Sequence, residues 1–460
     1  MKAVALLSVA AAAALASQPA AALGLFEAWQ AAQRNDREFA VARAAHEAAQ
    51  PRLNQGAALW RPEVLLSAAA GLGTNENEAR GAQFSTPAFG RSNDVAFDTS
   101  VTNGTVHRWT VSARQPLYNP ARRSQQQELL LSVDLAGVEW QAAVQSLRLR
   151  TAERYFGLAV AAETLRVLRA QSEAIGRATT EAQDRYRMGA APVTDTHEAK
   201  ARLAAATAQV LAAQRSLQLA RTALSDSTGI PVASIAARLP GPRTMGASMP
   251  LVQWLERSAQ GNPAIASQAM RVELAKQEAV RHSARAATSV DLVAQAGRER
   301  LSGSGDFGSA RNSSRNELIG VQVTVPLYTG GLRDAKHEEA LRRVEQARAE
   351  LQRIGEQVAQ QTHSAWLGLE VGVARVAALE DALEASEARL DMTQLGVEIG
   401  DRTTLDRLNA ENETTSARLA LVEARVTLLM DRLRLAALAG QLDDSAMQSV
   451  DAELARREGN

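Results

Sequence analysis

Apolar residues recur at every second position in four short segments of the chain. These segments are residues 64–72 and 109–113 in the first half and residues 290–296 and 319–325 in the second. A period of two places alternate side chains on opposite faces, so the pattern predicts four β-strands. Each expected strand is about ten residues long, close to the ~9–11 residues with which a tilted strand crosses a bilayer. Polar segments rich in Gly, Asn and Ser, at residues 74–106 and 298–316, are expected to be loops.

The other regular segments predict helices, in the same order in both halves. The expected helices are residues 25–59, 121–187 and 194–228, followed by residues 251–286, 332–397 and 404–439. Pro51 is expected to break the first of them, because proline has no N–H to donate. The two longest contain no proline, and at 1.5 Å per residue each would be on the order of 100 Å long.

The last helix of each half carries apolar residues at heptad spacing. A strict period of seven indicates supercoiled packing, and two stripes on one helix indicate a neighbour on each side. A soluble antiparallel coiled coil is the alternative that the heptads alone would favour. The stripes are Leu203, Val210, Leu217 and Leu224 with Ala206, Ala213 and Ala220 in the first half, and Leu421, Leu428 and Leu435 with Leu419, Val426 and Leu433 in the second.

The two halves also repeat each other in short motifs. Gln115-Pro116-Leu117-Tyr118 and Val325-Pro326-Leu327-Tyr328 share Pro-Leu-Tyr, and each motif lies between an alternating segment and a long helical one. Before the strands, Gln33-Arg34-Asn35-Asp36 corresponds to Gln260-Gly261-Asn262-Pro263. The mature chain therefore consists of two similar repeats. Their order of helices and strands suits the wall of a tube better than a globular domain.

Composition narrows the possible functions. The chain has 460 residues, 51 basic and 51 acidic, so no excess of positive charge indicates a nucleic-acid partner. It has no cysteine, which excludes disulfides, thiol catalysis and acylation of an N-terminal cysteine. His337-Glu338 is followed by Leu341 where a metalloprotease motif needs its second histidine, and neither G-x-S-x-G nor a phosphate-binding glycine loop occurs. We expect no enzyme activity, no cofactor and no metal site.

The domain boundaries follow from these patterns. Lys2, the apolar run from Val4 to Leu15 and Ala20-Ala21-Ala22 predict a signal peptide at residues 1–22. Residues 23–228 would form the first repeat and residues 251–440 the second. A Pro-rich linker at residues 229–250 would connect the repeats, and residues 441–460 would form a C-terminal tail.

Four strands from one chain cannot close into a barrel. Open sheet edges in lipid would leave backbone groups without partners, so the strands must be shared between subunits. Three copies would supply twelve strands, which lies within the range of outer-membrane barrels. Aromatic residues at the strand ends would lie at the inner interface of the membrane that the barrel spans or, equally, in the core where strand meets helix. These residues are Trp60, Tyr118 and Tyr328.

At this point the chain resembles the TolC family of trimeric outer-membrane efflux and secretion channels. The resemblance rests on the duplicated strand, Pro-Leu-Tyr and helix units, and on two Gly turns each followed by an aspartate six residues later, Gly189 to Asp195 and Gly400 to Asp406. It implies an α+β membrane protein in which a trimeric twelve-stranded transmembrane β-barrel is continuous with a long periplasmic α-helical coiled-coil tunnel. It also implies a mixed equatorial region, which would contain the linker at residues 229–250 and the C-terminal tail.

The resemblance also implies a gate at the inner end of the tunnel. Arg402 matches a family arginine that bonds the neighbouring coil, and the matching partner region is Thr194-Asp195. An arginine fork on a carboxylate gives a directional clamp that can be broken. Alternatively, Thr194 caps the return helix and Asp195 complements the helix dipole.

Asp406 matches a family aspartate that faces the pore near its narrowest point, where three copies would form an acidic ring. The alternative is a solvated helix face. Two positions depart from the family pattern: Asn409 replaces a second pore aspartate, and Val397 replaces a tyrosine of the clamp.

The two helix turns resemble the tips that dock the periplasmic adaptor. They consist of Met188, Gly189 and Ala190 and of Ile399, Gly400 and Asp401. Glycine permits positive φ and close backbone approach there, although a tight helix–helix turn would need the same residue.

The expected function is that of an exit duct in the outer membrane. It would be a passive homotrimer in outer-membrane lipid, exported by a signal peptide and not lipidated. Its partners would be a periplasmic adaptor and an inner-membrane ABC or proton-driven transporter, in a tripartite efflux pump or a type I secretion system. The alternative is a periplasmic coiled-coil adaptor protein of such a system, which would have one hairpin rather than two.

Overall fold

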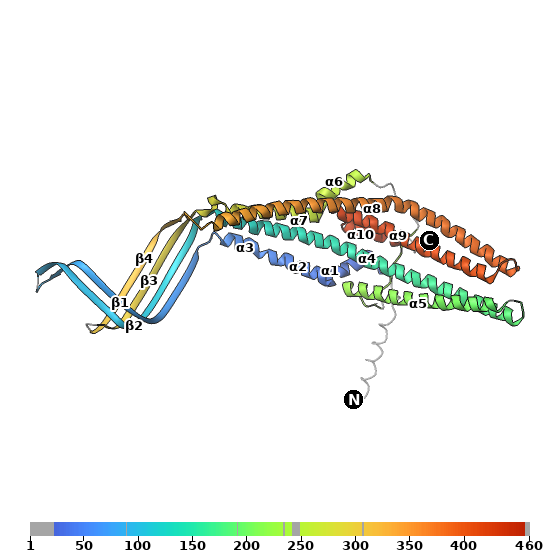
Figure 1. The fold of residues 1–460 in the computed structure, drawn as a ribbon, viewed down its shortest axis with the longest axis horizontal. Coiled ribbons are helices and arrows are strands. Elements are labelled where there is room, and N and C mark those ends of the chain that lie inside the picture. Colours follow the sequence, from blue (N-terminus) through green and yellow to red (C-terminus); the bar gives the residue numbers. More distant parts are fainter. Residues whose placement is uncertain are drawn as a thin grey trace, which may run out of the picture. The chain divides into compact units, whose positions relative to one another are not determined.

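The computed structural model describes residues 23–88, 90–190, 192–232, 235–241, 249–305 and 308–455. The expected signal peptide at residues 1–22 therefore lies outside the described residues. The described chain divides into two compact units (Figure 1). One combines the described parts of Met1–Ala48, Leu135–Ala269 and Ala349–Asn460, and the other combines those of Ala49–Asp134 and Met270–Arg348.

The helices follow the predicted order, with more breaks than the sequence indicated. The long helices and their return helices lie within three residues of the predicted ends, but the two shorter predicted helices are each interrupted. Pro51 begins a new helix as expected, whereas the breaks at Asp36 and Asn262 were not predicted. The helices are α1 Leu25–Asn35, α2 Arg37–Ala49, α3 Pro51–Ala58, α4 Pro120–Arg187, α5 Val193–Thr228, α6 Leu251–Gly261, α7 Pro263–His282, α8 Leu332–Glu398, α9 Thr404–Leu438 and α10 Asp444–Ala455, with a 3₁₀ turn at Ala284–Ala287.

The same asparagine contact accompanies the first break in each half. Asn35 Nδ2 donates to the carbonyl of Thr228, the last residue of α5, at 2.7 Å. Asn262 Nδ2 donates to the carbonyl of Leu438, the last residue of α9, at 2.9 Å. Each amide thus satisfies a carbonyl that the end of a helix leaves without an intrahelical partner. These are the two asparagines that correspond in the sequence motifs.

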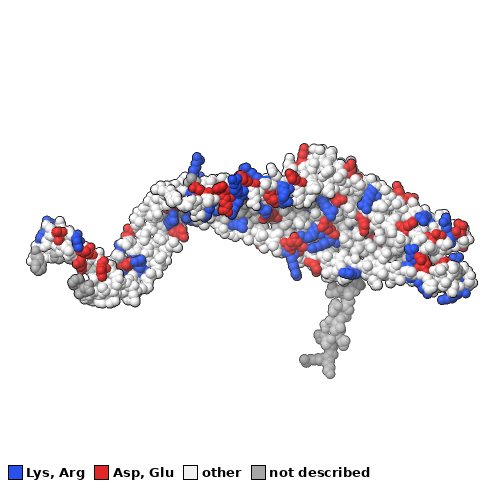
Figure 2. All heavy atoms as spheres, in the orientation of Figure 1, with Lys and Arg blue, Asp and Glu red and all other residues white. Residues whose placement is uncertain are grey.

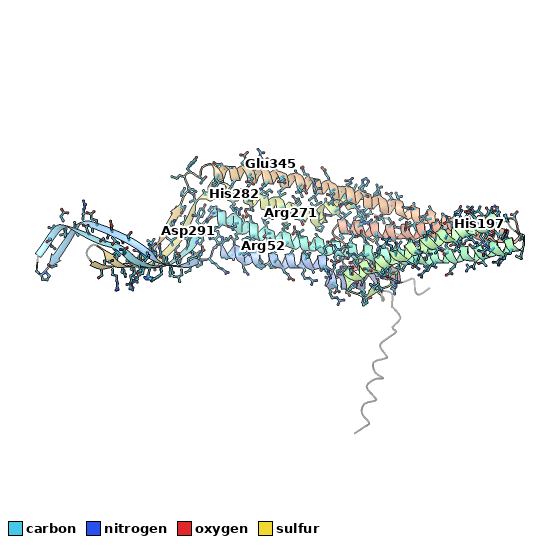
Figure 3. The ribbon with its side chains drawn as sticks, turned by 60° about the horizontal axis from the view of Figure 1, so that its bottom comes forward. Arg52, His197, Arg271, His282, Asp291 and Glu345 are labelled. Atoms are coloured by element: carbon cyan, nitrogen blue, oxygen red, sulfur yellow. The ribbon has the colours of Figure 1, made fainter. Side chains whose placement is uncertain are left out.

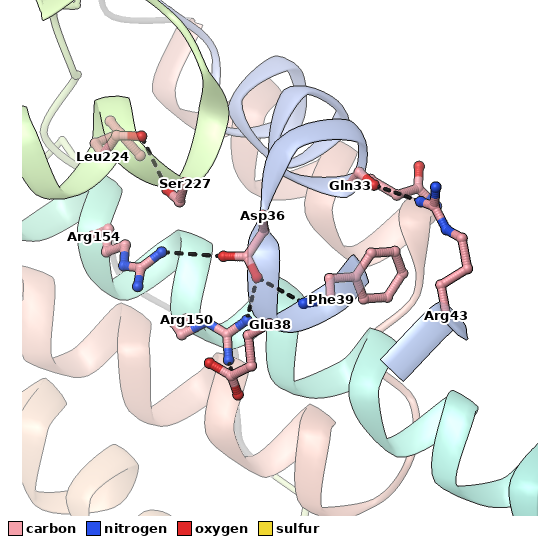
Figure 4. A network of polar contacts seen from close by, with 9 residues as sticks. All are labelled: Gln33, Asp36, Glu38, Phe39, Arg43, Arg150, Arg154, Leu224 and Ser227. Carbon is pink, nitrogen blue, oxygen red and sulfur yellow. Dashed lines mark hydrogen bonds and ion pairs between the residues drawn. The ribbon is translucent and has the colours of Figure 1, made fainter. Parts of the chain in front are cut away.

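Asp36 anchors the α1–α2 break to α4 (Figure 4). Its carboxylate is 6% exposed, accepts from the backbone N–H of Phe39 at 2.9 Å, and pairs with Arg150 at 2.9 Å and Arg154 at 3.3 Å. It therefore caps α2 and neutralises two guanidinium groups in one position. Arg150 also pairs with the exposed Glu38, at 2.7 Å.

The two stripes on α9 face two different apolar clusters, as the heptads predicted. Leu421, Leu428 and Leu435 pack with Ala365, Leu369 and Val376 of α8. Leu433 lies in a second cluster with residues of α1, α4, α5 and α10, and Val426 packs against that cluster. The helix consequently has neighbours on both sides within one chain.

The strands form one antiparallel sheet in the order β1-β2-β3-β4. They are β1 Glu63–Thr86, β2 Gly90–Tyr118, β3 Ser289–Gly305 and β4 Gly308–Thr324, with 24, 29, 17 and 17 residues. The four predicted strands are present, but the expected length of about ten residues is wrong. Most of the segments predicted as loops at residues 74–106 and 298–316 continue the strands as hairpins.

The two faces of the sheet differ in chemistry. One face exposes large apolar side chains on all four strands, including Leu66, Trp109, Leu292 and Val321. The other carries two ion pairs between β2 and β3: Arg114 with Asp291, which is 0% exposed, and Arg108 with Glu299 at 2.6 Å. We call these the apolar face and the charged face. Figure 3 labels Asp291 on the sheet.

The outer part of the β1–β2 hairpin bends toward the charged face. The pairing of β1 with β2 shifts between Gly73 and Asn75, and beyond Asn103 β2 has no β3 partner in the described register. A Cβ on Gly303 would overlap the carbonyl oxygen of Asn103, and one on Gly305 would overlap that of Ser100. The backbone of β2 thus crosses directly over the end of β3, which only glycine permits at this distance.

Tyr118 and Tyr328 are both exposed, so core packing at the strand ends is wrong for them. Tyr118 is the last residue of β2, whereas Tyr328 follows the end of β4. Trp60 is half-buried, and its indole N–H donates to Gln126 at 2.9 Å.

Candidate functional site: the two helix turns

The turn between α4 and α5 is compact and ends in exposed side chains. Backbone N–H groups of Met188, Gly189 and Ala190 donate to carbonyls of the last turn of α4, at 2.8–3.0 Å. Gly189 has φ +75°, so the predicted need for glycine is confirmed. Met188 is exposed, and α5 begins at Val193 after the extended Pro192.

The turn between α8 and α9 repeats this geometry. Gly400 has φ +82°, and the N–H groups of Asp401 and Arg402 both donate to the carbonyl of Gly396, at 2.8 and 3.1 Å. Ile399 is exposed at the position that corresponds to Met188. Each turn therefore presents one large apolar side chain to solvent beside its glycine.

Asp406 belongs to a capping box at the start of α9. Its backbone N–H donates to Thr403 Oγ1 at 3.1 Å, and its carboxylate accepts from the backbone N–H of Thr403 at 2.9 Å and from its hydroxyl at 2.8 Å. These hydrogen bonds to Thr403, with the charges of Arg402 and Arg389, lower the pKa of Asp406 below its ordinary value. Asp406 therefore stabilises the first turn of α9.

No hydrogen bond or ion pair joins Arg402 to Thr194 or Asp195 within the described part of the chain. The aliphatic stem of Arg402 lies over Gly396, where a Cβ would come 2.5 Å from its Cγ. Thr194 Oγ1 lies 3.5 Å from the carboxylate of Asp195, and Asp195 lies in the first turn of α5. Pro192 stands at the cap position of α5 without a side-chain cap, so the alternative that Thr194 caps this helix is wrong.

Contacts between the first hairpin (α4 and α5) and the second hairpin (α8 and α9) were missed by the sequence. Arg407 of α9 pairs with Glu181 of α4 at 2.9 Å, and Arg202 of α5 donates to Asn409 of α9 at 3.3 Å. Leu408, between these two contacts, is buried with small residues of α4 and α5. The Arg407–Glu181 pair spans 226 residues, so no local pattern could have indicated it.

Asn409 and Val397, the two positions that depart from the family pattern, each have defined contacts or burial. Asn409 accepts from Arg202, which an amide oxygen does without adding charge. Val397 is buried beside the second turn, where it packs as an apolar residue. Glu411, two residues after Asn409 on α9, is partly buried, and this burial raises its pKa above the ordinary value, although the charges of Arg177, Arg407 and Arg418 act in the opposite direction.

Within the described residues, no three His, Cys, Asp or Glu side chains come together in a way that could hold a metal ion. His197 lies on α5 near its turn (Figure 3). No described helix combines the length and apolarity that crossing a bilayer would take.

A long helical hairpin in each half and a four-stranded sheet with an exposed apolar face define a channel-type protein of the outer membrane. The family model described as "Outer membrane efflux protein" matches residues 28–230 and 254–441. The chain belongs to this family, which includes TolC, and is an outer-membrane exit duct for efflux or type I secretion.

Individual relatives and solved structures agree with this assignment. "Proteases secretion protein PrtF" of Dickeya chrysanthemi is 27% identical over 95% of this chain and 92% of its own length. "Outer membrane protein TolC" of Escherichia coli is 25% identical over 87% and 84%. The fold is similar to that of VceC from Vibrio cholerae, with a TM-score of 0.71, 21% identity and coverage of 91% of this chain and 97% of that one. It is also similar to CmeC from Campylobacter jejuni, with a TM-score of 0.73, 16% identity and coverage of 93% and 89%.

Proposed function

We propose that three copies of this chain form a twelve-stranded transmembrane barrel joined to a periplasmic helical tunnel. The observation that carries the proposal is the sheet: its apolar face is exposed on all four strands, and its edge strands β1 and β4 have no partner in the described chain beyond β2 and β3. An apolar surface with open edges suits a sheet that is completed by other copies within lipid. The charged face would then line the channel.

The chain is organised in this proposal as two repeats, residues 23–228 and 251–440, with a linker at residues 229–250 and a tail at residues 441–460. The matching contacts of Asn35 and Asn262 support an internal duplication, because corresponding residues bond corresponding helix ends. Residues 1–22 would direct export, and the chain would carry neither a lipid anchor nor an enzymatic activity.

The gate of this duct lies at the two helix turns. Since Arg402 and Asp195 do not pair within one chain, the proposed clamp joins Arg402 to Thr194 or Asp195 of the neighbouring copy. The exposed Met188 and Ile399, beside Gly189 and Gly400, would dock the periplasmic adaptor. Asp406 would contribute to a pore ring while remaining tied into its capping box.

The partners are an adaptor and an inner-membrane ABC or proton-driven transporter. Two relatives that cover most of this chain are named for protease secretion, PrtF and AprF, at 27% and 26% identity. These names favour a protein cargo. Secretion of a protease by a strain that carries this chain, and its loss on deletion of the gene, would support that choice over export of small molecules.

Electron microscopy of the purified chain in detergent tests the architecture. We expect a particle with threefold symmetry in which a short barrel adjoins a tunnel; a compact monomer that needs no detergent would refute it. The gate is tested by Arg402→Ser in planar bilayers, which we expect to raise single-channel conductance. Arg187→Ser, at the other turn and exposed, serves as the control and should leave conductance unchanged.

A further inference from the structure

The apolar face of the sheet ends abruptly, and the boundary crosses the four strands obliquely. On β1 the apolar residues continue to Leu72, which is level with Ser302 of β3 because both pair with Thr105 of β2. On β4 they end at Ile319, which pairs with Ala294 of β3. The boundary thus shifts by eight residues along β3 between the two edges of the sheet. A shift in one direction is expected where tilted strands cross a level membrane surface. Trp109 lies at the boundary on β2, as interfacial aromatic residues do.

Four arginines lie on the same face directly beyond this boundary. Arg298 stands opposite Trp109 on β2 and opposite Arg315 on β4, and Arg300 stands opposite His107. Arg311 lies opposite Ser302, two residues further along β3 than Arg300. Alternate residues of a strand share a face, so these side chains form one outward patch. We call Arg298, Arg300, Arg311 and Arg315 the arginine patch.

The arginine patch has a net positive charge and is open to solvent. All four side chains are exposed. Among the described residues of β3 and β4, one carboxylate, Glu317, shares this face, and it pairs with Arg315 at 2.5 Å. Four positive charges less one negative charge leave +3. The carboxylate of Glu299 points to the opposite face, where it pairs with Arg108.

The position of the charge is unusual for a barrel strand. Arginine pairs directly opposite each other repel, and Arg298 faces Arg315 across β3 and β4. Arg298 Nε donates to Ser313 Oγ at 3.3 Å, a hydrogen bond that adds no counter-charge. Figure 2 shows the middle of the sheet as largely uncharged, with charged side chains toward the hairpin ends. The repulsion within the patch is relieved if an anion bridges the guanidinium groups.

We propose that the arginine patch binds the phosphorylated headgroup of a lipid in the outer leaflet of the outer membrane. The inference rests on the proposed barrel, because that barrel turns the apolar face and the arginine patch toward lipid. A guanidinium group binds phosphate oxygens through two parallel hydrogen bonds, and adjacent arginines hold one phosphate between them. The apolar residues below the patch contact the acyl chains of the same lipid, so a lipid fits both surfaces where a free anion would fit one.

The test is lipid binding by the purified trimer in detergent, followed by native mass spectrometry. The probes are bis-phosphorylated lipid A, the same glycolipid with its phosphates removed, and phosphatidylcholine. We expect the trimer to retain the phosphorylated probe in preference to the other two. The double variant Arg300→Gln/Arg311→Gln should weaken retention by about 30-fold, because each basic side chain at a membrane surface contributes about a factor of five. Neither residue belongs to an ion pair among the described residues of the sheet.

Arg108→Gln is the matched control, because Arg108 lies in the same sheet, on β2 opposite Glu299 of β3, but on the charged face. It should leave lipid retention unchanged. Equal loss in the control and in the double variant, equal retention of the dephosphorylated glycolipid, or full competition by millimolar inorganic phosphate would each overturn the lipid site. Threefold particles with normal conductance in the double variant would show that the barrel survives such a failure. A chain that never forms a trimer in detergent would overturn the proposed function and the lipid site together.

Discussion

Replacing Arg407 by alanine should shift the duct toward its open state. If the proposed gate opens by moving the first hairpin away from the second, it must break the Arg407–Glu181 pair, which joins them at 2.9 Å. The arginine side chain is 19% exposed and the glutamate 43%, so the pair is partly screened by water. A pair of this kind stabilises by about 1 kcal/mol.

The effect is multiplied in a symmetric assembly. If three copies open together, the loss of three pairs amounts to about 3 kcal/mol, which shifts the ratio of open to closed channels by about 100-fold. The assay is open probability and conductance of the purified protein in planar bilayers, measured beside the wild type. Glu181→Gln should give a similar shift, and the double variant should add little to either single change, because both act on one contact.

Arg389→Ala provides the control for this reasoning. Arg389 pairs with Glu413 at 2.5 Å, but this pair lies within the second hairpin and its side chains are 60% and 52% exposed. Opening does not break it, so its loss should leave open probability unchanged. If Arg407→Ala had no effect, or if both variants shifted the channel equally, the hairpins would not separate at this contact.

Three further changes have defined outcomes. Asp36→Ala removes a helix cap and leaves two guanidinium groups without their shared carboxylate, so it should lower the free energy of unfolding by about 4 kcal/mol. The temperature at which the helical circular dichroism signal is lost should fall accordingly. Glu38→Ala is the control: Glu38 pairs with the same Arg150 but is 74% exposed, so its loss should cost less than about 1 kcal/mol. Glu411→Gln should raise the unfolding temperature at pH 7, because burial raises the pKa of Glu411 and so disfavours its ionised form in the fold. The gain in unfolding temperature should shrink as the pH falls and vanish below the ordinary glutamate pKa of 4.5. A gain that persisted below this pH would show that the ionisation of Glu411 is not its cause. Gly303→Ala forces the backbone of β2 off β3, so protease should cut the outer β1–β2 hairpin faster while the four-stranded part resists; unchanged cleavage would mean that the bend does not depend on this glycine.

The alternation of apolar and polar residues predicted the strands only where one face of the strand is apolar. The segments around Leu66 and Val321 have an apolar face and a second face on which, apart from Leu65 and Leu318, the residues are polar or small, so the period of two is visible in the sequence. Beyond Gly73 both faces meet water, polar residues occupy successive positions, and the period is lost although the backbone still pairs. A strand whose two faces have the same surroundings gives no signal in hydrophobicity.

The helix ends were predicted with mixed success for a similar reason. Proline marked the break at Pro51, while the break at Asp36 depends on contacts with Arg150 and Arg154, more than a hundred residues away. The gate region shows both cases. Thr403 and Asp406 stand at the spacing of a capping box and were readable as one, whereas the Arg407–Glu181 contact exists only because two hairpins fold against each other.

The outer part of the β1–β2 hairpin has a consequence for how this surface can change over evolution. From Asn75 to Thr86 the strand β1 pairs with β2 alone, with irregularities between Ala79 and Phe84, and the corresponding part of β2 has no partner on β3 in the described register. Residues can therefore be gained or lost in pairs, one on each strand, without altering the register of β2 with β3. The chain can lengthen, shorten or rewrite the part that would face the surroundings of the cell while the four-stranded sheet stays the same, which makes this hairpin the place to insert a foreign peptide for display.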